Sequence, residues 1–163
     1  MRVFFAAIAA LVTVSCATPY QQSGFTGGVQ ALPIGRDTYR VEAALNAYSS
    51  QSMVQDYLLL RAAETAQSNG AVGFVIHGAQ DTSTTGRVVV PGQATTNAYA
   101  YGAGNYAYGQ ATTTYTPAQA YNFIRPGGMM MITLVREPVP AGLQYFSASE
   151  IIAAIGPRVR RAN

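Results

Sequence analysis

The 163-residue chain offers few side chains that could form a catalytic or metal-binding group. It has one histidine, His77, one cysteine, Cys16, and seven acidic residues. A structural zinc site takes several Cys or His ligands, and a serine hydrolase needs a base beside its nucleophile. His77 could be combined with a serine and Asp81, but the sequence lacks the Gly-x-Ser-x-Gly turn that presents such a serine. We therefore predict no catalytic residue, no metal site and no cofactor, and we interpret His77 as an ordinary surface residue.

Cys16 follows a segment with the features of a secretory signal. Arg2 is positively charged, and Val3–Val14 is an uncharged run within the ~7–15 apolar residues of a signal peptide and below the ~20 that span a bilayer. Thr13-Val14-Ser15-Cys16 resembles the lipobox read by lipoprotein signal peptidase, with Thr13 in place of the more common Leu. The Cys16 thiolate would take a diacylglycerol group, and cleavage would free its amine for a further chain such as palmitate. The alternative is an ordinary signal peptide cut after Ala17.

The same region predicts the compartment and the anchor. Residues 1–15 are expected to be removed as a signal peptide, and residues 16–23 to form the lipidated cysteine and a flexible tether, because they are rich in Thr, Gln, Ser and Gly. Ala17, not Asp, follows Cys16. By resemblance to lipoproteins of Gram-negative bacteria, this favours the periplasmic face of the outer membrane. With Cys16 acylated, the mature chain has no disulfide and depends on packing for its stability.

Charge is sparse and its positive part is carried by arginine alone. The chain has ten Arg, no Lys and seven acids, and only 10% of its residues are charged, against ~25% in typical domains. So few charges do not predict a nucleic-acid partner. A basic tail over residues 158–163 carries Arg158, Arg160 and Arg161, which are candidates for binding anionic lipid headgroups or another partner, because Arg forms paired contacts to phosphate. The alternative is a solvated, frayed terminus.

Hydrophobic periodicity predicts a hairpin followed by one main helix. Strands are expected over residues 25–32 and 38–45. The helix is expected over residues 53–69, capped by Ser52 with Gln55 and ended by Gly70. Arg61 and Glu64 are three residues apart on this helix and are predicted to form a structural ion pair.

Three shorter elements complete the predicted domain. Residues 74–76 suit a buried strand, and residues 129–136 have apolar side chains on both faces, as in a central strand. A last helix is expected over residues 148–155, capped by Ser147 with Glu150 and ended by Gly156-Pro157. The sequence therefore predicts an α+β domain over residues 24–157, with a small, mostly antiparallel sheet of about four strands, in the order strand-strand-helix-strand-loop-strand-helix, and with both helices on one face.

Residues 79–121 differ in composition from the rest of the chain. Thr, Gly, Ala, Tyr and Gln dominate, and Tyr99-Ala-Tyr-Gly recurs as Tyr106-Ala-Tyr-Gly. We favour an irregular insertion over about residues 82–120, because such a segment presents no regular apolar face. The alternative is an extended hairpin turning at Gly104-Asn105, with Tyr99 and Tyr101 facing Tyr106 and Tyr108. In either case these four tyrosines are candidates for binding a protein or a glycan.

Two segments carry a resemblance to a known family. They are the helix Asp56-Tyr-Leu-Leu-Leu-Arg-Ala-Ala-Glu64 and the helix end Gly156-Pro157-Arg158. Together with Cys16, they resemble a family of small Gram-negative bacterial lipoproteins of uncharacterised function. The resemblance implies a location and a fold but no catalytic residue. It favours a membrane-anchored, non-enzymatic binding or structural protein of the cell envelope, whose partner is an envelope protein or a glycan. The alternatives are a peptidoglycan or other envelope hydrolase using His77, and a stress-sensing lipoprotein.

Overall fold

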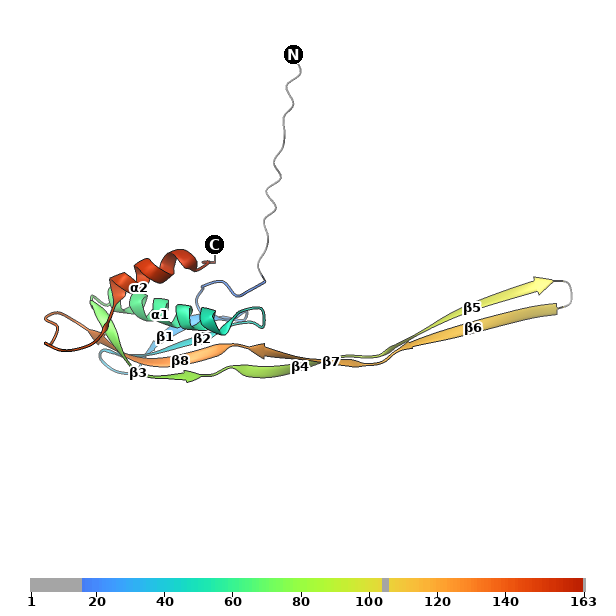
Figure 1. Cartoon of the computed structure of the whole chain (residues 1–163), viewed down its shortest axis with the longest axis horizontal. Coiled ribbons are helices and arrows are strands. Elements are labelled where there is room, and N and C mark those ends of the chain that lie inside the picture. The colour runs from blue at the N-terminus through green and yellow to red at the C-terminus, as the bar shows by residue number, and fades with distance from the viewer. Residues whose placement is uncertain (1–15, 104–105, 163) are drawn as a thin grey trace, which may run out of the picture.

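The computed structural model describes residues 16–103 and 106–162, which form a body and a long two-stranded ribbon that projects from it (Figure 1). The elements, in chain order, are β1 (Gly28–Pro33), β2 (Thr38–Ala44), α1 (Gln51–Ser68), β3 (Gly73–Asp81), β4 (Thr84–Val90), β5 (Gln93–Ala103), β6 (Tyr106–Thr116), β7 (Gln119–Arg125), β8 (Gly127–Val135), β9 (Phe146–Ser147) and α2 (Ala148–Ile155), followed by a 3-10 turn over Gly156–Arg158.

The body contains a five-stranded sheet in the order β1-β2-β8-β3-β9, with every neighbouring pair antiparallel. The α+β class is confirmed, and β8 is the central strand that its apolar residues on both faces predict. The predicted count of about four strands is wrong, and so is the predicted order of elements, because β4 to β7 stand between β3 and β8 and β9 precedes α2. The sheet has a fifth, two-residue strand, β9, and the ribbon adds two further two-stranded sheets. A strand as short as β9 is too short to leave a periodic signal in the sequence.

The helix α1 begins two residues earlier than its sequence pattern predicts. Ser50, not Ser52, is the N-cap: its backbone is extended, and its Oγ accepts a hydrogen bond of 3.3 Å from the Met53 N–H. Ser52 lies inside the first turn, where its hydroxyl contacts that of Ser50. The helix ends as predicted at Asn69 and Gly70. Three nearby serines offered the same capping chemistry, and the direction of the incoming chain selected Ser50.

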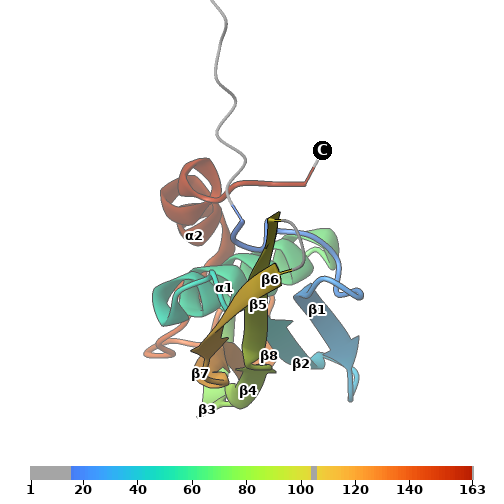
Figure 2. The same cartoon turned by 90° about the vertical axis from the view of Figure 1, so that its right-hand side faces the viewer.

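The core lies on both sides of α1, because the sheet covers one side and α2 packs on the other (Figures 1 and 2). Val54 and Leu58 are buried, as expected for a face turned to the sheet. Tyr57 and Leu60 are also buried. The second layer explains this wide buried surface, because a helix covered on two sides needs apolar residues around most of its circumference.

The segment for which we favoured an irregular loop is an antiparallel ribbon, so that prediction is wrong. The strand pairing of the hairpin alternative is confirmed, whereas its turn at Gly104-Asn105 lies outside the described residues. The ribbon consists of β4 paired with β7 and β5 paired with β6 (Figure 1). It continues β3 and β8, which are already paired in the body. Thr, Val and Tyr favour extended backbone, and pairing across the ribbon satisfies half of its backbone hydrogen bonds without an apolar face.

Helix α1 approaches the sheet closely at Gly128 of β8. A Cβ atom on this residue would lie 2.8 Å from Val54 Cγ1 and 2.9 Å from Leu58 Cδ1. We expect Gly128→Ala to lower the free energy of unfolding by about 1–3 kcal/mol, because the helix would have to move away from the strand. Urea unfolding followed by circular dichroism, on the unacylated chain, measures the change.

Gly78 on the neighbouring strand β3 is the matched control, because a Cβ atom there would meet nothing within 4 Å. We expect Gly78→Ala to change the stability by no more than about 0.5 kcal/mol. Equal losses in the two variants would show that the close approach of α1 does not limit packing.

Candidate functional site

The ribbon is the most unusual surface of the chain, because it is long, solvent-exposed and almost free of charge: its charged residues are Arg87 in β4 and Arg125 in β7. From residue 88 to residue 124 the sequence has no Asp, Glu, Lys or Arg. β5 and β6 have 11 residues each and, at about 3.3 Å per residue, extend about 36 Å. Within the described residues, each pairs only with the other, so both outer edges expose unpaired N–H and C=O groups.

Large apolar and aromatic side chains accompany these open edges. On the outer part of the ribbon, Tyr99, Tyr101 and Tyr115 are 63%, 70% and 69% exposed. Nearer the body, the exposed residues are Val88, Val89, Val90, Tyr121 and Ile124. Monomeric soluble domains rarely expose a continuous group of such side chains, and where they do, it commonly marks an interaction surface.

The register of β5 and β6 places the four candidate tyrosines at specific positions. Tyr101 is paired with Tyr108, as the hairpin alternative predicts. Tyr99 is paired with Gln110 and Tyr106 with Ala103, so these two do not face each other as predicted. Residues two apart on a strand, and residues paired across strands, share a face. Tyr99 and Tyr101 therefore share one face of the ribbon, whereas the side chains of Tyr106 and Tyr108 lie outside the described part. Tyr115 is paired with Ala94 and belongs to the opposite face, which otherwise carries mainly Ala, Gly and Thr.

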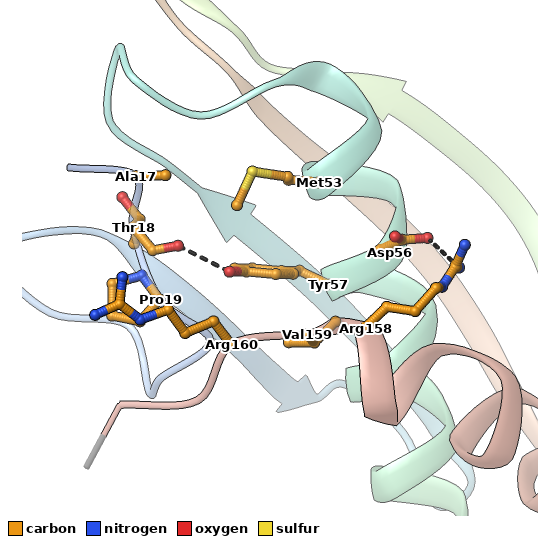
Figure 3. Close-up of a pocket in the computed structure, with 9 residues that line it drawn as sticks. All are labelled: Ala17, Thr18, Pro19, Met53, Asp56, Tyr57, Arg158, Val159 and Arg160. Carbon is orange, nitrogen blue, oxygen red and sulfur yellow. Dashed lines mark hydrogen bonds and ion pairs between the residues drawn. The ribbon is translucent and has the colours of Figure 1, made fainter. Parts of the chain in front are cut away.

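The segment after Cys16 is held against the body, in place of the flexible tether predicted over residues 16–23 (Figure 3). Thr18 is buried: its N–H donates to Ser49 Oγ (3.1 Å), its Oγ1 accepts from the Asn46 N–H (2.9 Å), and its carbonyl accepts from the Tyr57 hydroxyl (2.8 Å). The carbonyl of Cys16 itself accepts from Asn46 Nδ2 at 2.7 Å. The position of Cys16 relative to the body is therefore defined by hydrogen bonds.

Glu64 joins the two ends of the described chain. Its Oε2 accepts a 2.5 Å hydrogen bond from the hydroxyl of Tyr20, and its Oε1 accepts one of 2.7 Å from Arg161, whose guanidinium lies 5.1 Å from the centre of the Tyr20 ring. Backbone bonds link Tyr20 to the residues on either side of Arg161. Arg61, the predicted partner of Glu64, is only at the 4.0 Å limit of an ion pair. The carboxylate therefore serves mainly Tyr20 and Arg161.

The basic tail is consequently ordered along much of its length. Arg158 pairs with Asp56 at 3.2 Å, and Arg161 pairs with Glu64, so two of the three arginines proposed for partner binding have intramolecular partners. Arg160 is exposed and lines a pocket of about 170 Å³ together with Ala17, Pro19 and Met53, next to the Cys16 segment (Figure 3). Of the tail arginines, Arg160 is the one for which the described residues contain no ion pair.

Burial and hydrogen bonding where the chain ends meet change the pKa values of Tyr20, Tyr57 and Arg161. Burial, together with the hydrogen bond to Glu64, raises the pKa of the Tyr20 hydroxyl well above its usual value of 10.0. Burial also raises the pKa of Tyr57, and the hydrogen bond to Glu64 raises the pKa of Arg161. All three groups stay in their ordinary protonation states at neutral pH. The network is therefore suited to holding the chain ends together and not to proton transfer.

In the structure, His77 contacts a threonine hydroxyl. On β3, His77 Nε2 lies 2.8 Å from Thr133 Oγ1 of β8, on the exposed side of the sheet. Among the described residues, no carboxylate is hydrogen-bonded to His77, and no group of three His, Cys, Asp or Glu residues could hold a metal ion.

Comparisons of the chain with protein-family models, with curated proteins and with solved structures give no match. The resemblance to the lipoprotein family therefore stays a prediction from the sequence. In the part of the chain that the structure describes, no helix has the length and apolar character needed to cross a membrane.

Tyr20 should make the stability depend on alkaline pH. An unfolded tyrosine releases its proton near pH 10.0, whereas the buried Tyr20 keeps its proton to higher pH. Above pH 10 the folded state therefore binds more protons than the unfolded state, and stability is lost by up to about 1.4 kcal/mol per pH unit for each such group. Tyr57 contributes with the same sign.

We expect Tyr20→Phe to cost about 1.5–3 kcal/mol at pH 7, because Glu64 loses a donor, and to make the decline above pH 10 shallower than in the wild type. Urea unfolding between pH 7 and pH 11 measures both effects. A variant with the wild-type slope above pH 10 would show that Tyr20 is not the group responsible.

Proposed function

We propose that this protein is a lipoprotein of the bacterial outer membrane, anchored through Cys16 on the periplasmic face, that acts without catalysis by binding an envelope partner along the β4–β7 ribbon. The observation that carries the proposal is the ribbon itself: its outer strands β5 and β6 are uncharged, have unpaired edges and project away from an otherwise well-packed body (Figure 1).

Exposed strand edges are normally protected in natural proteins. Natural sheets protect their edges with lysine, proline, bulges or a covering element, because an open edge pairs with other chains. The β5–β6 pair has no charged residue, and its two flanking prolines, Pro91 and Pro117, lie outside both strands. A two-stranded ribbon is also only marginally stable alone in water. A partner that adds a strand to the edge would pair the open N–H and C=O groups and would also stabilise the ribbon.

The side chains indicate how such a partner would be recognised. Strand addition gains affinity from main-chain hydrogen bonds and specificity from side chains at alternate positions. Here Tyr99 and Tyr101 occupy alternate positions on one face, and each combines apolar contact area with a hydroxyl that hydrogen-bonds to protein or glycan. The ribbon therefore supports binding of an extended, largely uncharged segment. The lack of a carboxylate on His77 within the described residues gives the hydrolase alternative no comparable support.

Site-specific photocrosslinking in cells tests the proposal. A benzophenone amino acid at Tyr101 or Tyr115 should capture a discrete partner, identified by mass spectrometry, because both side chains are exposed on the ribbon. Ile34, 50% exposed in the turn between β1 and β2, is the control position and should capture nothing in common with them. The same products from all three positions would contradict a role for the ribbon.

Removing the outer ribbon should separate folding from binding. Val90 and Gln119 are paired in register, so Asn-Gly in place of residues 91–118 can close them as a two-residue hairpin. We expect the body to keep its stability within about 0.5 kcal/mol, because the core residues lie outside this segment. Capture from a probe at Tyr121, which remains in the variant, should fall at least tenfold. Undiminished capture would show that the outer ribbon is not the binding element.

A further inference from the structure

We propose that the face around Cys16 is a membrane-docking surface, on which the exposed aromatic side chains of Phe25 and Tyr48 insert into the headgroup region of the bilayer that holds the acyl chains. This inference rests on the proposed acylation of Cys16. It adds a second, side-chain contact with the membrane and a defined orientation of the body.

The anchor, Cys16, lies very close in sequence to the folded body. Ala17 is the one residue between Cys16 and the buried Thr18. At no more than about 3.6 Å per residue, two residues reach about 7 Å. In addition, the Cys16 carbonyl is hydrogen-bonded to Asn46. Acyl chains on Cys16 must lie in the hydrocarbon, so the surface around Asn46 must lie at the headgroups.

The surface beside Asn46 carries two exposed aromatic side chains. Among the residues that the structure describes, Phe25 and Tyr48 have the highest exposed fractions of the large apolar and aromatic side chains, 108% and 76%. Both lie beside Asn46: the Tyr48 N–H donates to Asn46 Oδ1 at 3.1 Å, and Phe25 lines the same pocket as Asn46. Single exposed aromatics are common on proteins, but aromatic side chains are specifically enriched at the membrane–water interface.

A tight turn holds Phe25 in its exposed position. Gly24 and Gly27 exchange backbone hydrogen bonds of 3.1 and 3.3 Å, and the Gln21 side chain binds both Thr26 Oγ1 and the Gly27 carbonyl. Gly27 has a φ of 94°, and a Cβ on it would lie 2.5 Å from the Ala44 carbonyl oxygen. The turn therefore cannot fold back to cover Phe25 without breaking these contacts.

Basic side chains border the same surface. Arg125 lines the pocket that contains Phe25, and Arg160 lines the pocket that contains Ala17. The acid in these two pocket linings is Asp56, which is already paired with Arg158. The surface therefore combines two aromatics with unneutralised positive charge, which suits the anionic headgroups of a bacterial membrane.

The chain has no tryptophan, so a single introduced Trp reports on one position. The acylated protein carrying Phe25→Trp or Tyr48→Trp is reconstituted in vesicles of phosphatidylethanolamine and phosphatidylglycerol with and without bromine on the acyl chains. We expect bromine to lower the emission of both by at least twofold. The matched exposed controls are Ile34→Trp, in the turn between β1 and β2, and Tyr115→Trp, on the ribbon. Bromine should lower the Trp emission of these two variants by less than a tenth.

The outcomes separate this inference from the proposed function. If mass spectrometry shows acylated Cys16 but the Trp at position 25 is quenched no more than the controls, the docking surface is wrong and the anchored lipoprotein stands. If Cys16 carries no acyl group, the anchor and the docking surface both fail, whereas the ribbon is tested by its own crosslinks. Quenching of all four positions alike would also overturn a specific docking face.

Discussion

The antiparallel pairing of β3 with β8 is the constraint on which the rest of the structure depends. These two strands are joined in sequence only through the ribbon, so their register in the body continues outward as β4 with β7 and then β5 with β6. In the body, β8 also pairs with β2, and its Gly128 receives α1. One register therefore positions both the helix on the sheet and the direction in which the ribbon leaves it. A shift by one residue would exchange the two faces of all these strands.

The second organising feature is the meeting of the chain ends over α1. An exposed ion pair contributes only about 0–1 kcal/mol, so Arg158–Asp56 alone would not order the tail. The burial of Tyr20, its hydroxyl on Glu64 and the backbone bonds on either side of Arg161 act together and hold the segment after Cys16 in place. In the proposed function, this connection transmits the position of the anchor to the body, and the β3–β8 pairing transmits it to the ribbon. A partner on the ribbon would then be held in a defined direction relative to the membrane.

The elements predicted correctly are those whose signal is local. The two helices carry their own caps and apolar spacing, and β8 carries a run of apolar residues on both faces. The N-cap of α1 was missed because Ser49, Ser50 and Ser52 compete within four positions, and the chain direction that decides between them is a tertiary property. The ribbon was expected only as the alternative to an irregular segment, because its residues show no apolar alternation. Their extended state follows from the pairing of β3 with β8, 40 or more residues apart in sequence, which composition does not encode.

The sequence by itself determined the features that depend on residue type and neighbours along the chain. These are the cysteine after an apolar leader, the absence of charge between residues 88 and 124, and the local capping and periodicity of the body. Only the tertiary structure decided which polar groups meet. Tyr20 and Arg161 lie 44 and 97 residues from Glu64 in sequence, yet share its carboxylate. The tertiary structure also decided that Phe25 and Tyr48 lie beside Asn46, which is hydrogen-bonded to Cys16. A contact between residues far apart in sequence depends on the packing of the whole chain, so the local sequence around each residue does not predict it.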